Sequence, residues 1–257
     1  MIQKKMPNFP KELNFNRNGY TFVKIDKNLN KKLILIRKIL KNKQDSLIKL
    51  NERNYYKEIL RLQKQINKKI STSKFFEIYK DFFYEIFKEE NFSIQHYFYL
   101  RAVKPKKNKN FKPISFHRES FQGPSYFKKM YNIWIPLLNC NNENALKFYQ
   151  KSHKFIKNKD FKFKIKKTSI TKGSDAHQTG LLYKYRELLF KRKIYKKKLF
   201  KKKNIILFSG ELIHGNGENL TNKIRFSIDA RFILKKHMKK NHIQSSTGKE
   251  YFISKSY

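Results

Sequence analysis

The sequence predicts a mainly β fold that carries a helical part near its N-terminal end. Residues 28–92 place apolar side chains at three- and four-residue steps, which is the period of amphipathic helices. From residue 93 the apolar runs become short, rich in β-branched and aromatic residues, and separated by Gly, Pro, Asn or Ser, which is typical of strands. The 257 residues, 39% of them hydrophobic, can bury a sizeable core, so we expect a single domain spanning residues 1–257.

The helical part consists of segments that each repeat an apolar stripe. They read NKKLILIRKIL, DSLIKLNERNYYKEILRLQKQI and SKFFEIYKDFFYEIF. Asp45 and Ser73 begin the second and third segments, and the side-chain oxygens of Asp and Ser accept hydrogen bonds from the free amides of a first helical turn. We therefore predict helix starts at these two residues.

The β part is predicted over residues 93–232. Its strand-like segments read SIQHYFYLRAV, PISFHRES, YNIWIPLLN, ALKFYQ, NIILFS, ELIHGN and KIRFSIDARFI. Lys dominates residues of about 151–203, a stretch that we expect to be an insertion at the rim of the β part. Residues 233–257 are predicted to form a basic C-terminal tail.

The net charge of +42 is the most extreme feature of the composition. Lys and Arg spread over a surface favour a polyanionic partner, because they displace the counterions of phosphate groups. However, the abundant residues Lys, Asn, Ile, Phe and Tyr all have codons rich in A and T, so much of this composition can arise without selection for binding. Nucleic-acid binding is therefore an alternative interpretation, and it is not the favoured one.

The chain has one cysteine, Cys140, which excludes an internal disulfide and fits a reducing cytoplasm. It follows a strand-like segment and is expected to be inert. The N-terminus has no continuous apolar segment that would act as a signal peptide, and the run LILI is far too short to span a bilayer, which takes about 20 residues. We expect a soluble, cytoplasmic protein with no membrane partner, whereas its oligomeric state is not predicted.

The segment ISFHRES places His117 and Glu119 two residues apart in an alternating run of apolar and polar residues. Successive side chains of a strand point to opposite faces, so these two side chains share one face, where they could hold one ion. A pair at this spacing is common by chance, so it indicates a metal site only if the downstream sequence supplies further ligands.

Residues 204–232 supply a second group of polar side chains. An apolar strand is followed by His214, a glycine-rich turn, and a strand whose two faces differ sharply. On one face of this last strand lie Arg225, Ser227, Asp229 and Arg231. Such a polar face suits a pocket inside a barrel, with the opposite, apolar face covered by the N-terminal helices.

Two imidazoles and one carboxylate, here His117, His214 and Glu119, form the facial triad of a metal site, which leaves the other octahedral positions open. This arrangement suits non-haem Fe(II), because a bidentate co-substrate and dioxygen must bind next to each other. Arg225 follows His214 by 225 − 214 = 11 residues. Its planar guanidinium can clasp a carboxylate through two charge-assisted hydrogen bonds, and the hydroxyl of Ser227 can add a third.

At these residues the sequence resembles a known family. The blocks FHRES, NIWIPL and HGNGENLTNKIRFSIDARF are similar to those of Fe(II)/2-oxoglutarate-dependent dioxygenases, in particular the phytanoyl-CoA-dioxygenase-like branch, which includes oxygenases of carbohydrate and antibiotic clusters. The resemblance covers residues of about 93–232. It implies a double-stranded β-helix, the jelly-roll or cupin-like architecture, with the N-terminal helices packed on one sheet. Glu119 stands where the family more often has aspartate.

The resemblance also implies a site and a reaction. His117, Glu119 and His214 would bind Fe(II), and Arg225 and Ser227 would bind the co-substrate 2-oxoglutarate. The implied enzyme uses O2 to hydroxylate a small metabolite, such as a sugar or a nucleotide-linked sugar. The alternatives are a highly basic nucleic-acid-binding protein on a jelly-roll scaffold and an oxygenase that acts on a nucleic acid.

Further residues are candidates for the wall of the pocket. They are Arg101, Asn132, Trp134 and Arg231. Arg101 fits a surface charge as well as it fits a contact to substrate or co-substrate, and Trp134 fits the core better than the site. Asp229 and Arg231 share a strand face and are predicted to pair with each other. His96 is predicted to pack within a strand, because the metal ligands are already supplied.

Overall fold

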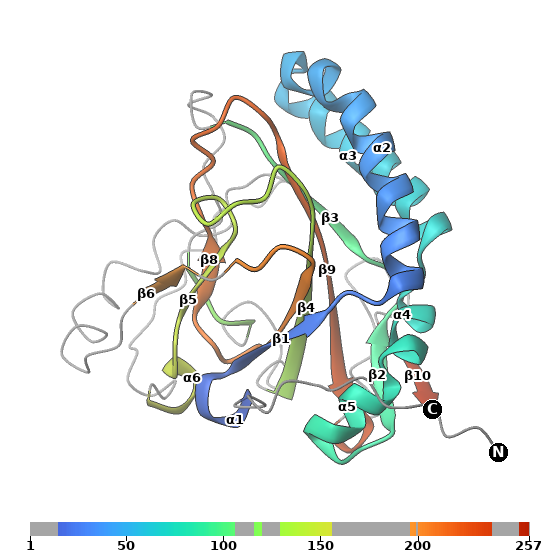
Figure 1. Ribbon diagram of the computed structural model, residues 1–257, viewed down its shortest axis with the longest axis vertical. Coiled ribbons are helices and arrows are strands. Elements are labelled where there is room, and N and C mark those ends of the chain that lie inside the picture. Colours follow the sequence, from blue (N-terminus) through green and yellow to red (C-terminus); the bar gives the residue numbers. More distant parts are fainter. Residues whose placement is uncertain are drawn as a thin grey trace.

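The computed structural model describes residues 15–105, 116–119, 129–155, 196–198, 200–237 and 252–256. In this part of the chain two antiparallel β-sheets pack against each other, and helices cover the outer face of the larger sheet (Figure 1). The predicted mainly β fold with helices packed on one sheet is confirmed.

The larger sheet has seven strands in the order β1-β7-β4-β9-β2-β10, with β3 also paired to β9. These strands are β1 (Tyr20–Lys24), β2 (Asn91–Gln95), β3 (Tyr99–Val103), β4 (Met130–Leu138), β7 (Asn204–Ser209), β9 (Arg225–Leu234) and β10 (Phe252–Ser256). The smaller sheet has three strands in the order β6-β5-β8. They are β5 (Leu146–Tyr149), β6 (Lys196–Lys198) and β8 (His214–Asn216).

The helices of the described ranges lie mostly between β1 and β2 in the sequence. They are α1 (Phe15–Asn18), α2 (Lys27–Lys49), α3 (Glu52–Lys69), α4 (Thr72–Ile78), α5 (Lys80–Phe87), α6 (Ser152–Phe155) and the 3₁₀ helix η4 (Lys235–His237). α2 is the longest, but lysines recur along it. Within the part of the chain that the structure describes, none of the helices is both long and apolar enough for a bilayer span.

The helix starts predicted at Asp45 and Ser73 are wrong. α2 runs through Asp45, because Leu40 and Leu47 continue one buried stripe on the same helix face without a break. The cap of α4 is Ser71, two residues before Ser73, and its side chain accepts from the amide of Lys74.

The alternation of side chains along β9 separates the two faces of the larger sheet. The outer face packs against α4 and α5: Phe232 is fully buried, and its ring lies 5.0 Å from that of Phe76 and 5.2 Å from that of Phe83. Burial of a phenylalanine side chain stabilises the fold by roughly 1.5–3 kcal/mol. The inner face, toward the smaller sheet, carries Arg225, Ser227, Asp229 and Arg231, as the sequence predicted.

Two strands lie outside the region predicted to be β. β1 precedes the long helices and pairs with β7, and β10 lies within the expected C-terminal tail and pairs with β2. The expected Lys-rich insertion at about residues 151–203 falls largely outside the described residues. Its described parts include α6 and β6, and β6 pairs with β5 in the smaller sheet.

Candidate metal centre

Two chain segments meet to place the candidate metal ligands. His117 and Glu119 lie on one short segment, and His214 is the first residue of β8. The amide of His117 donates to the carbonyl of His214 (2.8 Å), and the amide of His214 donates to the carbonyl of His117 (2.9 Å). Gly215 permits this close crossing, because a Cβ at that position would lie 3.0 Å from the Cα of Phe116.

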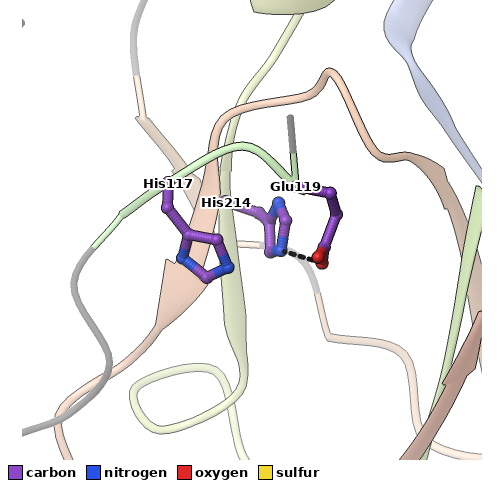
Figure 2. A group of neighbouring side chains, drawn as sticks. All are labelled: His117, Glu119 and His214. Atoms are coloured by element: carbon purple, nitrogen blue, oxygen red, sulfur yellow. Dashed lines mark ion pairs between the residues drawn. The ribbon is translucent and has the colours of Figure 1, made fainter. Parts of the chain in front are cut away.

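The three side chains converge between the sheets (Figure 2). One ligand atom from each of His117, Glu119 and His214 lies within 4.8 Å of the other two, and all three residues are buried. Nε2 of His214 is 3.6 Å from Oε1 of Glu119, and the two imidazole rings are 4.4 Å apart. Two imidazoles and one carboxylate at this spacing fit a divalent metal ion of the facial-triad type.

The tautomer of His214 is set by the main chain. Its Nδ1 lies 2.8 Å from the carbonyl oxygen of Leu212, so Nδ1 carries the proton and donates it to that oxygen. In the neutral form of this tautomer, Nε2 carries the lone pair, and Nε2 lies 3.6 Å from Oε1 of Glu119. The ring of Phe208 packs edge-on against His214 at 4.7 Å and fixes its plane.

The carboxylate of Glu119 is held by Arg231. Nη2 of Arg231 lies 3.0 Å from Oε2 and 3.3 Å from Oε1 of Glu119. Burial alone would raise the pKa of Glu119, but the charge of Arg231, together with His214 and His117, holds the pKa well below its usual range. Glu119 is therefore ionised at neutral pH and available as a ligand. Its amide donates to the carbonyl of Gly210 (2.9 Å), which anchors the segment.

Arg225 forms a second, separate polar group on the inner face of β9. It is fully buried, its Nη1 donates to Oγ of Ser227 (2.7 Å), and its Nη2 donates to Oδ1 of Asn216 (2.8 Å). Among the described residues, its Nε has no hydrogen-bond partner and no carboxylate forms an ion pair with it. Burial lowers the pKa of Arg225, yet a guanidinium stays charged in proteins. A buried cation without an anion suits the carboxylate of a ligand.

Comparison with known proteins places this geometry on a known fold. No family model and no curated protein matches the sequence. The solved structure of EctD from S. alaskensis with 2-oxoglutarate and 5-hydroxyectoine matches with a TM-score of 0.59 at 12% identity, over 98% of this chain and 85% of that chain. The chain adopts a double-stranded β-helix fold.

Two further solved structures share this double-stranded β-helix. The non-heme alpha ketoglutarate dependent epimerase SnoN from nogalamycin biosynthesis matches with a TM-score of 0.50 at 11% identity, over 85% of this chain and 80% of that chain. The non-heme alpha ketoglutarate dependent carbocyclase SnoK from nogalamycin biosynthesis matches with the same TM-score and identity, over 88% of this chain and 84% of that chain. The predicted jelly-roll architecture is thereby confirmed.

The predicted pairing of Asp229 with Arg231 is wrong. Asp229 instead receives two hydrogen bonds from Arg101, with Nε to Oδ1 at 2.6 Å and Nη2 to Oδ2 at 3.0 Å. β3 lies beside β9 in a register that places Tyr99 opposite Asp229, so Arg101 reaches Asp229 diagonally. Arg101 is thus neither a lone surface charge nor a free pocket group, and Arg231 is directed to Glu119.

Asn132 and Trp134, two of the candidates for the pocket wall, share the inner face of β4. Asn132 lies opposite Arg231 on one side and Phe208 on the other. Trp134 is buried, and its ring packs in an apolar cluster with Phe208. Nδ2 of Asn132 and Nε1 of Trp134 are both buried, and neither has a hydrogen-bond acceptor in the described part of the chain.

Two residues of the inner face are not predicted from the sequence. Asn216 accepts from Arg225. It could have been identified from its position two residues after His214, which places both side chains on the same face of β8. The sequence signal that could have identified Gln95 is its position directly after the apolar Ile94, which places it on the opposite face of β2. The prediction for His96 is wrong, because it lies exposed in the bend between β2 and β3.

Proposed function

We propose that this protein is an Fe(II)- and 2-oxoglutarate-dependent dioxygenase that hydroxylates a small metabolite. The observation that carries the proposal is the coexistence of two buried groups between the sheets. One is the cluster of His117, Glu119 and His214, and the other is the guanidinium of Arg225, which has no anion beside it among the described residues. A metal site alone would not need the second group, whereas a metal site with a dicarboxylate co-substrate needs both.

The ligand cluster would hold the iron through three donor atoms. Nε2 of His214 offers a lone pair because the carbonyl of Leu212 fixes the proton on Nδ1, and His117 supplies the second imidazole. Glu119 is ionised and can offer one oxygen while the other stays near Arg231. When bound, Fe(II) and 2-oxoglutarate together supply the activation of dioxygen that oxidises a C–H bond.

Arg225 and Ser227 would bind the carboxylate of 2-oxoglutarate that lies away from the metal. The unpaired Nε of Arg225 and the hydroxyl proton of Ser227 are both available as donors, since the hydroxyl oxygen already accepts from Nη1. Arg225 and Ser227 are both fully buried, and burial strengthens charge-assisted hydrogen bonds. A bound dianion would also compensate the buried positive charge of Arg225.

The surrounding side chains would exclude water from the reacting atoms. Trp134 and Phe208 form an apolar wall on the inner face of the larger sheet, and Phe208 contacts His214 directly. Arg101 and Asp229 close the neighbouring part of the face with their ion pair. Such a wall fits the handling of a reactive oxidant, because side reactions with water are suppressed.

A small substrate fits this enclosed position better than a macromolecule. The ligands are buried between the sheets, so a sugar or a nucleotide-linked sugar is the substrate that we propose. The reaction is expected in the cytoplasm, where a reducing environment keeps iron in the Fe(II) state and suits a chain with a single cysteine. O2 would be the second substrate.

The proposal is tested by adding Fe(II) and 2-oxoglutarate to the protein without oxygen. A weak visible charge-transfer band is expected in the wild type and is expected to be absent in His214→Ala. The matched control is His96→Ala, which removes an exposed imidazole outside the cluster and should keep the band. A folded wild-type protein that binds neither metal nor 2-oxoglutarate would refute the proposal.

A further inference from the structure

Three buried N–H groups on the inner face of the larger sheet have no acceptor among the residues that the structure describes. They are Nε2 of Gln95, Nδ2 of Asn132 and Nε1 of Trp134. The three residues are between 0% and 2% exposed, so bulk water does not reach them. A buried donor without an acceptor costs about 1–3 kcal/mol, and such groups are rare in native proteins. Three such donors on one face are what a site for an accepting ligand would contain.

These donors flank Arg231 on two sides. Asn132 of β4 lies opposite Arg231 of β9 in the strand register, and Gln95 of β2 accepts from the amide of Arg231 through Oε1 (3.0 Å). Because Oε1 of Gln95 accepts from the backbone of β9, Nε2 of the same side chain is directed away from β9. Trp134 follows two residues after Asn132 on the same face, and its indole can only donate. We call Gln95, Asn132, Trp134 and Arg231 the donor row.

The donor row adjoins the candidate metal centre through the contact of Arg231 with Glu119. It is separate from the group around Arg225, which contacts Asn216 of β8. Arg225 and Arg231 are six residues apart on one strand, so their backbones are separated by roughly 20 Å. The two groups therefore lie at the two ends of the polar face, and one small dicarboxylate does not fill both.

We propose that the donor row binds an oxyanion of the primary substrate, such as a carboxylate, sulfate or phosphoryl group. This inference rests on the proposed function, since it takes Arg225 as the place of 2-oxoglutarate. The unpaired polar atoms of Gln95, Asn132 and Trp134 are all donors, so they match a group that only accepts. A metal that shares Glu119 would leave the charge of Arg231 less compensated, which favours an anion over a neutral hydroxyl. Of the two substrates named above, a nucleotide-linked sugar carries such a group and a simple sugar does not.

The single tryptophan of the chain is a built-in reporter for this site. Trp134 emission is recorded while inorganic phosphate is added to protein that holds Zn(II), a redox-inert stand-in for iron, and 2-oxoglutarate. Sodium chloride keeps the ionic strength constant, so that weak binding of phosphate to surface lysines is suppressed. A saturable change in emission is expected with phosphate, and glucose, as an uncharged probe, is expected to give none.

Gln95→Glu tests the row with the smallest change in shape. It keeps an acceptor for the amide of Arg231 and replaces the unpaired donor by an anionic oxygen. The half-saturating phosphate concentration is expected to rise at least about tenfold. Gln65→Glu makes the same change on the exposed face of α3 and should leave the response unaltered. Asn132→Asp provides a second variant of the row should Gln95→Glu fail to fold.

Several outcomes would overturn the inference. They are an absent or unsaturable phosphate response, equal responses of Gln95→Glu and Gln65→Glu, and a stronger response to glucose. An emission change completed by 2-oxoglutarate alone would assign the donors to the co-substrate instead. Calorimetry of the same samples keeps the two proposals apart, because absent binding of Zn(II) and 2-oxoglutarate would refute the proposed function. The phosphate titration of metal-free protein would then decide the oxyanion site by itself.

Discussion

Glu119 is longer by one methylene than the aspartate that is commoner in the resembled family. The additional rotatable bond has to be fixed if the carboxylate is to meet two imidazoles, since free rotamers weaken a site. Arg231 provides that restraint by contacting both carboxylate oxygens, and the amide of Glu119 is tied to Gly210. The longer ligand and its arginine partner therefore act as one unit.

The pH dependence of metal-free protein tests this unit. The pKa of Glu119 is depressed in the folded state, so its ionised form contributes stability above the unfolded pKa of about 4.3, and this contribution is lost as the pH falls toward the folded pKa. We expect wild type to be more stable than Glu119→Gln by a constant margin from pH 8 to pH 5. The margin should narrow below that range, as measured by urea unfolding. A margin that is unchanged at pH 3 would contradict the ion pair.

Arg225 is expected to act on the co-substrate and not on the metal. Arg225→Ala should raise the KM for 2-oxoglutarate about 10- to 100-fold, because charge-assisted hydrogen bonds contribute roughly 1.5–3 kcal/mol. The affinity for Zn(II), measured by calorimetry, should stay as in wild type. Arg61→Ala, which removes an exposed arginine of α3, is the matched control. An equal loss of metal affinity in Arg225→Ala would place this residue in the metal centre itself.

At the scale of single residues, the sequence was a better guide to the residues of the candidate metal centre than to the ion pairs around it. The period of two places His117 and Glu119 on one face, and the resemblance to the dioxygenase family implied His214 as the third ligand; the structure brings all three together. The partner of Asp229 could not be predicted, because it depends on β3 lying beside β9, which is a long-range pairing.

Among the elements, β9 has the largest role, since its two faces serve two purposes. Its outer side chains pack against the helices, and its inner side chains supply Arg225, Ser227 and Arg231 to the site. It also lies in the middle of the larger sheet, paired with β4, β2 and β3. A loss of packing on the outer face should therefore also disturb the positions of the site residues on the inner face.

Phe232 is the residue through which this coupling can be tested. Phe232→Ala should lower the free energy of unfolding by about 3–5 kcal/mol, because it opens a cavity among the aromatic rings of α4 and α5. Leu220→Ala is the control, since Leu220 is 63% exposed and the same kind of truncation should change stability by less than about 0.5 kcal/mol. Similar losses in the two variants, measured by urea unfolding, would contradict the packing of β9.

The elements that the sequence missed share a physical cause. β1 and β10 are each five residues long and gain their stability from pairing with distant strands, β7 and β2. A short run has too little periodicity to stand out before its neighbours are known. The helix starts fail for a related reason, since a residue that can cap a helix does so only where the buried stripe begins.

For the whole molecule, the test is whether a bound metal stabilises the fold. Zn(II) at 100 times its dissociation constant should raise the free energy of unfolding by about 2.7 kcal/mol, since a ligand that binds only the folded state shifts the equilibrium. The rise in melting temperature should disappear in His214→Ala and persist in His96→Ala, whose imidazole lies outside the centre. Equal shifts in the two variants would indicate metal bound elsewhere.

The net charge of +42 belongs to the same scale. If the alternative function, nucleic-acid binding, were the principal one, affinity should fall steeply between low and moderate salt, because phosphate contacts release counterions. We expect weak binding without sequence preference, and no effect of Glu119→Gln on it. A tight complex that depends on the metal centre would instead favour an oxygenase that acts on a nucleic acid.

The hydrogen-bonded bridge between His117 and His214 also bears on the order in which the protein assembles. It joins positions 214 − 117 = 97 residues apart, and contacts of such high sequence separation form late, after loop closure has been compensated by other structure. We therefore expect the larger sheet to form before the three ligands meet around an ion. Bound metal should then leave the refolding rate nearly unchanged and lower the unfolding rate. It would stabilise the protein by keeping the native state from unfolding.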